Sequence, residues 1–324
     1  MTCTKNSFAL LASTPFLIFV AAGLFVLGLC SGSEWIAPWD FFGDEQAIVE
    51  LRATRMLAAL VAGGALALSG AVFQVVLRNP LAEPFTLGLS GGAGVGATLA
   101  FVLGLRAVSI YSVPVCALVG ALLVLGLVLF VSRGGTRGDG SLLLSGVIAG
   151  TISGSILMYI LSIAKVEDLA NVTWWMLGDL QAVDWALLTP ALVILVVALV
   201  LLRFYAGDMN VLSLGNETAW GFGVSVRTLT FMLILVGAML AASTVAMAGI
   251  IGFCGLIIPH VVRMLYGCDH RKVIFKIFWT GAAFLMACDI VSRSVYVQRE
   301  IPIGVITALV GGPLFLWLLN RGKK

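Results

Sequence analysis

Charged residues are scarce in this chain, and their scarcity excludes a soluble globular protein. Of the 324 residues, 11% are charged and 60% are hydrophobic, whereas a soluble domain has about 25% charged and roughly 45–50% apolar residues. The mean hydropathy is +1.10. A surface with so few charges cannot stay hydrated, so the chain is expected to lie in a lipid bilayer. The 37 glycines agree with this, because small residues let helices approach closely in lipid.

Motifs for catalysis, metal binding and redox chemistry are also missing from the sequence. The six cysteines lie far apart with no C-x-x-C pair, and they are interpreted as packing residues. Neither His260 nor His270 has a second ligand within reach in the sequence, so no metal site is expected. Without a G-x-x-x-x-G-K-[ST] stretch, there is no P-loop to hold a nucleotide phosphate. The net charge of +3 comes mostly from basic residues between apolar runs, and nucleic acid is not an expected ligand.

What the sequence does contain is about ten long apolar runs. Each is near the roughly 20 residues that a helix needs to cross the hydrocarbon core, and no loop between them is long enough for a soluble domain. The first run exceeds the roughly 7–15 residues of a signal-peptide core, so it is predicted to be a retained helix. Residues 1–324 are therefore predicted to form one all-α polytopic membrane domain. The runs are 8–30, 56–77, 86–105, 108–131, 141–163, 187–204, 228–248, 250–267, 274–296 and 302–319.

The placement of charges orients these predicted helices. If the N-terminus is cytoplasmic, most of the 19 basic residues fall in inner segments and most of the acidic residues in outer ones. Basic residues favour the cytoplasmic side, so both termini are predicted to lie inside the cell. Tryptophans in the outer segments are placed as in an aromatic belt: Trp35, Trp39, Trp174, Trp175 and Trp185.

Several short stretches are distinctive. In residues 78–84 (RNPLAEP), two prolines bracket a polar turn on the predicted inner side, since proline restricts the backbone before it. This stretch alone would suit any tight turn between helices. Together with others, it closely resembles the FecCD family of ABC-transporter permeases over nearly the whole chain. The matching segments are 66–71 (LALSGA) with Gln74, 79–94 (NPLAEPFTLGLSGGAG), 214–217 (LGNE), 252–260 (GFCGLIIPH) with Arg263, and 300–305 (EIPIGV).

The resemblance implies a fold and a set of partners. Members have the type II ABC importer fold, with ten helices per subunit and a homodimer around a central pathway. Two cytoplasmic ATPase subunits would bind ATP and Mg, so this chain would need no cofactor and would not be an enzyme. A periplasmic or surface-anchored binding protein would deliver the substrate to the bacterial cytoplasmic (inner) membrane. Family substrates are ferric siderophores, haem and cobalamin; the resemblance favours cobalamin and the family's prevalence favours iron chelates, so the choice stays open.

The resemblance also assigns a coupling loop to residues 208–226, on the inner side. This segment is polar for the chain, and its glycines permit a helix-turn-helix. In the family this loop docks into a cleft of the ATPase. An ordinary solvated loop is the alternative. The residues expected to make the contact are Met209, Leu212, Leu214, Gly215, Glu217, Ala219 and Phe222.

Binding-protein docking and gating are the other two roles that the resemblance implies. Arg52, Arg55 and Arg293 are basic on the predicted outer side, against the overall bias, and match arginines that receive glutamates of the binding protein. Residues 53–54 (AT) depart from the usual Leu-Pro there, and snorkelling at the membrane edge is the alternative. The cytoplasmic gate is expected at the start of the third helix and in the loop 133–141: Ser90, Gly91, Gly138, Asp139 and Gly140.

An ion-coupled secondary transporter is the main alternative function. Such a protein needs ionisable residues at the bilayer midplane and two similar halves. Only Asp289 is of this kind, and Arg293, one turn later, is its expected ion-pair partner, which favours a structural role over a proton relay. An intramembrane enzyme would need a catalytic constellation that the sequence does not supply.

Overall fold

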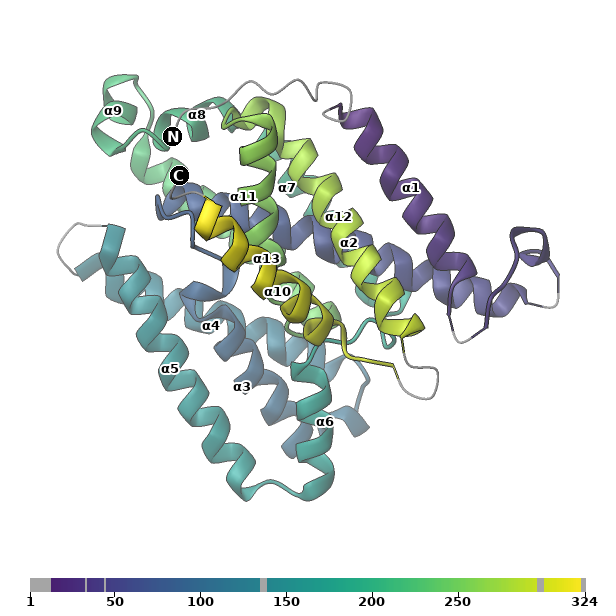
Figure 1. Ribbon diagram of the computed structural model, residues 1–324. Helices are drawn as coiled ribbons and strands as arrows, with labels where there is room; N and C mark the ends of the chain where they lie inside the picture. The colour runs from purple at the N-terminus through teal and green to yellow at the C-terminus, as the bar shows by residue number, and fades with distance from the viewer. Residues whose placement is uncertain (1–12, 33, 44, 135–138, 296–299, 322–324) are drawn as a thin grey trace.

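The computed structural model describes residues 13–32, 34–43, 45–134, 139–295 and 300–321, and within them it is entirely helical (Figure 1). The described residues form thirteen α-helices joined by short turns and three single-turn 3-10 helices. The helices are α1 Thr14–Cys30, α2 Gln46–Val76, α3 Leu89–Val102, α4 Ser112–Gly134, α5 Asp139–Ile163, α6 Val166–Met176, α7 Trp185–Phe204, α8 Ala206–Leu212, α9 Asn216–Gly221, α10 Val226–Ala248, α11 Cys254–Tyr266, α12 His270–Ser294 and α13 Ile303–Arg321.

Each of the ten predicted apolar runs overlaps one of these helices, and the largest difference is at α2, which begins ten residues before the predicted run. Six are long and apolar enough to cross a membrane, namely α2, α4, α5, α7, α10 and α12. Four apolar helices are shorter: α1, α3, α11 and α13. The prediction of an all-α polytopic membrane protein is therefore confirmed. Helices α3 and α11 both start after irregular backbone: Gly88 before α3 and Phe253 before α11 have left-handed conformations.

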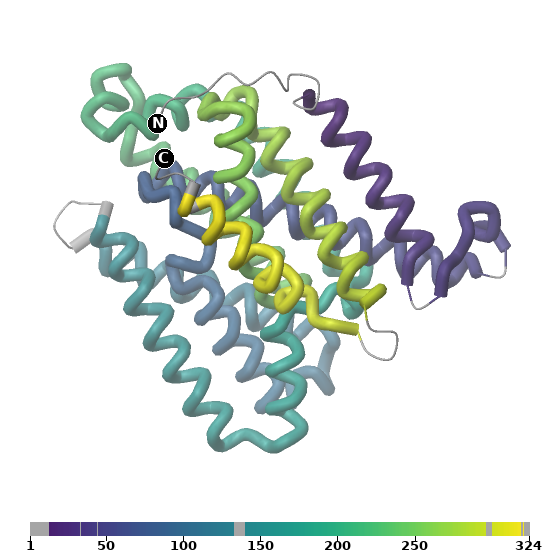
Figure 2. The backbone as a smooth tube through the Cα atoms, in the orientation of Figure 1, coloured from purple at the N-terminus to yellow at the C-terminus, as the bar shows by residue number. Residues whose placement is uncertain are grey.

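Helix α2 is the centre of the bundle and packs against α1, α7, α10, α11 and α12 (Figure 2). Glycines bring it close to two of these neighbours. A Cβ atom added to Gly70 would lie 1.8 Å from the carbonyl oxygen of Gly255 on α11, and one added to Gly63 would lie 2.3 Å from that of Gly281 on α12. Backbones can approach this closely only where no side chain intervenes, as is usual between helices in lipid.

Two of the stretches that carry the family resemblance lie in contact. Glu83 of the RNPLAEP turn accepts a hydrogen bond from the backbone of Phe253, the residue just before α11. Burial raises the pKa of the Glu83 carboxyl, and this hydrogen bond opposes the rise. Phe253 has a left-handed backbone (φ 66°), a conformation that is costly for an aromatic residue. Pro84 lies against Gly255 in the first turn of α11, so Pro84 and Glu83 of the first stretch together fix the irregular start of the second.

A second layer of α3, α4 and α5 covers one side of the bundle (Figure 1). Here too the contact depends on small residues: a Cβ on Gly96 of α3 would lie 2.0 Å from the carbonyl oxygen of Cys116 on α4. The following helix, α6, was not predicted. It has only 11 residues and carries Glu167 and Asp168 in its first turn, so no apolar run marks it in the sequence.

Packing is the role found for most of the cysteines that the structure describes. Cys30, Cys254 and Cys288 are buried and Cys116 is partly buried, as expected of packing residues. Cys268 is exposed, so the packing interpretation is wrong for it. Cys3 lies outside the described residues.

Candidate functional site

A short helical hairpin, α8 and α9, projects from one end of the bundle. This end also holds the start of α5 and the end of α13 (Figure 1), so by the charge bias it is the cytoplasmic end. The predicted helix-turn-helix is confirmed. Gly215 forms its turn with φ 122° and ψ 155°, a backbone conformation that essentially only glycine adopts.

The predicted coupling residues divide into an exposed and a buried group. Leu214 and Phe222 are 70% and 74% exposed, and Glu217 is also exposed. Met209, Leu212 and Ala219 are at most 2% exposed, so their predicted contact with an ATPase is corrected: they hold the hairpin onto the bundle. The sequence analysis overlooked Trp220, which is 78% exposed, although a tryptophan in a polar cytoplasmic loop is a signal of a binding surface.

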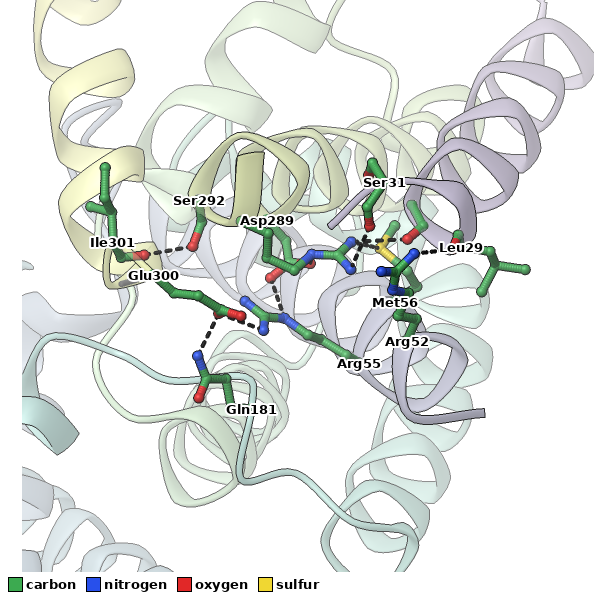
Figure 3. Close-up of polar contacts among 12 residues, drawn as sticks. Leu29, Ser31, Arg52, Arg55, Met56, Gln181, Asp289, Ser292, Glu300 and Ile301 are labelled. Carbon is green, nitrogen blue, oxygen red and sulfur yellow. Dashed lines mark hydrogen bonds and ion pairs between the residues drawn. The ribbon is translucent and has the colours of Figure 1, made fainter. Parts of the chain in front are cut away.

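At the opposite, outer end, four charged side chains form one network (Figure 3). Arg55 of α2 donates to the buried carboxylate of Asp289 on α12, at 2.8 Å, and to Glu300, at 2.6 Å. Gln181 also donates to Glu300. Arg293 lies 3.0 Å from the other oxygen of Asp289, as the spacing of one turn predicted, in an ion pair without hydrogen-bond geometry. The network contains two positive and two negative groups and is neutral.

The outer arginines also complete α1. The last carbonyl groups of a helix lack partners within it, and here two arginines supply them. Arg293 donates to the carbonyls of Gly28 and Ser31, and Arg52 donates to those of Leu29 and Cys30 (Figure 3). Cations at a helix C-terminus are also favoured by its dipole. This capping gives a physical reason for basic residues on the outer side.

The docking arginines differ in accessibility. The Arg293 side chain is only 4% exposed, so the structure places it inside the protein rather than on a docking surface. Arg52 and Arg55 are partly buried and line a cavity of about 910 Å³ that opens at the outer end. Arg293 also borders this cavity. The rest of the lining is divided between apolar residues, among them Ile48, Leu51 and Trp185, and the acidic and polar residues Glu34, Glu50, Thr54, Gln181, Asp184 and Glu300.

The predicted gate residues do not form one cluster within the chain. Gly91, at the start of α3, packs against Ser153 of α5, whereas Gly140 lies in the first turn of α5 and is exposed. Thirteen residues of α5 separate these points, about 20 Å at 1.5 Å per residue. Ser90 is partly buried beside Gly91. Gly138 lies outside the described residues, and of Asp139 the structure describes the backbone only.

Metal-ligating side chains do not cluster in the described part of the chain, where no three His, Cys, Asp or Glu residues could hold an ion. His260 packs edge-on against Phe315 of α13, with ring centroids 6.2 Å apart. His270 is buried at the start of α12. The two histidines thus have separate packing positions.

A bundle of apolar helices with an outer cavity at one end and a projecting cytoplasmic hairpin at the other is the architecture of a multi-pass membrane permease. The chain belongs to the FecCD transport family, whose sequence profile matches residues 17–321. It is the permease subunit of a bacterial ABC importer in the inner membrane, and it works with ATPase and binding-protein partners. ATP hydrolysis belongs to the ATPase partner, so this chain is a transport subunit and not an enzyme.

Individual relatives agree with the family. The chain is 37% identical over 302 residues to the vitamin B12 import system permease protein BtuC of Yersinia enterocolitica, covering 92% of this chain and 90% of the relative. It is 36% identical over 316 residues to BtuC of Citrobacter koseri, covering 97% and 94%. Among solved structures, it resembles an inward-facing metal-chelate type ABC transporter with a TM-score of 0.89 and 30% identity, covering 95% of this chain and 98% of that one.

Proposed function

We propose that two copies of this chain form the pathway for a metal chelate, with an ATPase subunit docked on the α8–α9 hairpin of each copy. The names of the relatives support a chelate as cargo, and BtuC supports cobalamin over ferric siderophore and haem. ATP-driven closure of the ATPases moves the hairpins and opens one end of the pathway as the other shuts, as alternating access requires.

The exposed hairpin is the observation that carries this proposal. Leu214, Trp220 and Phe222 are each at least 70% exposed on a segment that also carries Asp208, Asn216 and Glu217. Such a polar segment does not lie in the hydrocarbon, so its apolar side chains have no lipid to cover them. An apolar patch with a polar rim is typical of a protein interface, and Glu217 adds a charge for orientation.

A single substitution tests the docking surface. We expect Trp220→Glu to lower co-purification of the ATPase at least ten-fold, because a buried aromatic anchor is typically worth about 2 kcal/mol or more. Trp39→Glu is the matched control, since Trp39 is 82% exposed but lies in the outer segment, and this variant should retain the ATPase. Wild-type co-purification with Trp220→Glu would refute the docking assignment.

At the outer end, we assign docking of the binding protein to Arg52 and Arg55. Both line the outer cavity, and arginine pairs strongly with partner carboxylates. Arg293 supports this surface from beneath by holding Asp289 and α1. Asp289 is paired with two arginines. This pairing supports a structural role for Asp289, and a proton relay is not needed to explain a carboxylate at this depth.

At the cytoplasmic end, the gate is proposed to form between two copies. Gly140 would meet its counterpart across the dimer, because Gly140 is exposed in this chain and lies far along α5 from Ser153, which Gly91 contacts; of the other predicted gate residues of this loop, Gly138 lies outside the described residues. Ser90 and Gly91 would then act by fixing the position of α5. Their small size matters, since a Cβ on Gly91 would lie 2.9 Å from Ser153.

A further inference from the structure

Asn210 joins the hairpin to the start of α12 by two hydrogen bonds. Its side-chain oxygen accepts from the backbone N–H of His270, at 2.8 Å, and its amide nitrogen donates to Asp269, at 2.7 Å. An N–H can only donate, so the first bond fixes the orientation of the amide in the second. Asp269 also accepts from the backbone N–H of Arg271 and so caps α12. The hydrogen bond from Asn210 lowers the pKa of Asp269, so the carboxylate is ionised at neutral pH.

The remaining contacts of α8 with α12 are of a different kind. A Cβ on Gly207 would lie 2.6 Å from the guanidinium of Arg271, and Met209 and Leu212 are buried beneath the hairpin. Apolar contacts let two elements slide past one another, because the hydrophobic effect is non-directional. The bonds of Asn210 are directional, and one of them is charge-assisted. They fix the position of α8 along and around the axis of α12.

Helix α12 connects this junction with the opposite end of the molecule. It is 25 residues long, without an internal proline, and about 29 Å separate His270 from Asp289 at 1.5 Å per residue. At its outer end, Asp289 and Arg293 hold α2 and α1. Backbone contact of Gly281 with Gly63 fixes its middle against α2. A displacement at His270 therefore reaches the outer charge network through one continuous helix.

We infer that Asn210 is a positioning residue that transmits movement of the α8–α9 hairpin into α12, and movement of α12 back into the hairpin. The inference rests on the proposed role of the hairpin as the ATPase-docking element. It separates two properties: the exposed side chains Leu214, Trp220 and Phe222 bind the ATPase, whereas Asn210 and Asp269 carry the signal. Loss of the Asn210 contacts should therefore leave the ATPase bound and uncouple it from events at the outer end.

The experiment measures how strongly the binding protein stimulates ATP hydrolysis by the complete complex in proteoliposomes, a quantity that needs no knowledge of the cargo. We expect Asn210→Asp to lower this stimulation at least three-fold, because a second carboxylate would face Asp269. The ATPase content of the purified complex should stay within two-fold of wild type. Asn210→Ala, which deletes both bonds without repulsion, should have an intermediate effect.

The decisive comparison is a double variant in which residues 210 and 269 exchange their side chains, so that the contact between them is restored. In the double variant Asn210→Asp with Asp269→Asn, the amide nitrogen of residue 269 donates to residue 210, and residue 210 still accepts from the backbone of His270. The capping bond from Arg271 is lost, because it reaches the same Asp269 oxygen that Asn210 contacts. This variant should therefore recover most of the stimulation that Asn210→Asp loses. Ser213→Ala is the control, since the exposed Ser213 hydroxyl donates to the backbone of Asn210 within the same turn; this variant should behave as wild type.

The outcomes separate this inference from the proposed function. Wild-type stimulation in Asn210→Asp, or loss that the double variant does not reverse, would overturn the role of Asn210. If the wild-type chain did not bind an ATPase at all, the proposed function itself would be wrong. A proportional loss of ATPase content and stimulation in every variant would show a role in assembly only, and would also overturn the inference.

Discussion

At the scale of single residues, the three outer arginines have three different environments. Arg293 is enclosed between Asp289 and the end of α1. Arg55 bridges a buried and a partly exposed carboxylate. Arg52 donates hydrogen bonds to backbone carbonyls, those of Leu29, Cys30 and Glu34, and the Glu34 and Glu45 carboxylates interact with it only through their charge. A residue that is paired and buried contributes to folding, whereas a partly exposed arginine bound only to neutral carbonyls keeps its charge available to a partner.

Substitutions of Arg293 and Arg52 should therefore differ in kind. Arg293→Met leaves the Asp289 carboxylate with one partner fewer, and breaking a buried ion pair costs about 3–5 kcal/mol, so we expect a lower Tm in detergent. Arg52→Glu loses three hydrogen bonds to backbone carbonyls at and after the end of α1, so we expect a smaller fall in Tm than for Arg293→Met. The folded variant should bind the binding protein at least ten-fold more weakly, because the partner's carboxylates would be repelled. Equal affinity in Arg52→Glu and wild type would contradict docking at this residue.

At the scale of secondary-structure elements, close backbone contact decides which helices pair. The contacts of α2 with α11 and α12 are made at glycines, and hydropathy alone does not reveal them. The predicted spans were correct because each apolar run must form a helix in lipid. Helix α6 escaped prediction because it is short and begins with acidic residues, and the burial of Met209 and Ala219 depends on packing against distant helices.

A valine at Gly70 should destabilise the α2–α11 contact. Its Cβ would lie 1.8 Å from a backbone oxygen of Gly255, which cannot rotate away, and overpacking typically costs about 1–3 kcal/mol, occasionally more. We expect a clearly lower Tm for Gly70→Val. Gly126→Val on α4 is the matched control, because a Cβ there meets nothing within 4 Å. Similar Tm values for the two variants would show that the contact is looser than described.

At the scale of the whole molecule, the working unit is larger than this chain. The charge network at the outer end joins Arg55 to Glu300 across 245 residues of sequence, and no local pattern indicates such a pairing. The Asp289–Arg293 pair, by contrast, followed from helical spacing alone. The proposed partners of the exposed hairpin and of the gate lie outside the chain, so the family resemblance, and not the fold of one subunit, supplied those proposed roles.

Crosslinking between copies tests the proposed dimer and its gate together. In a background where the exposed Cys268 is replaced by serine, Gly140→Cys should form a disulfide between two subunits in one nucleotide state of the assembled importer. Alternating access requires the cytoplasmic ends to approach and separate during the cycle. The measurement is the fraction of crosslinked dimer with ATP and Mg, with ADP, and without nucleotide. Equal fractions in all three conditions would argue against a gate at this position.

The capping of α1 by arginines from α2 and α12 bears on how the protein is made. Arg52 is synthesised soon after α1. Arg293, which binds the carbonyl of Ser31, lies 262 residues later in the chain, so it is synthesised roughly 13–50 s after Ser31 at ordinary rates. Arg293 arrives with Asp289 one turn before it, so α12 can enter the bilayer with its charge already compensated. Helix α1 is thus completed by a helix that is synthesised much later.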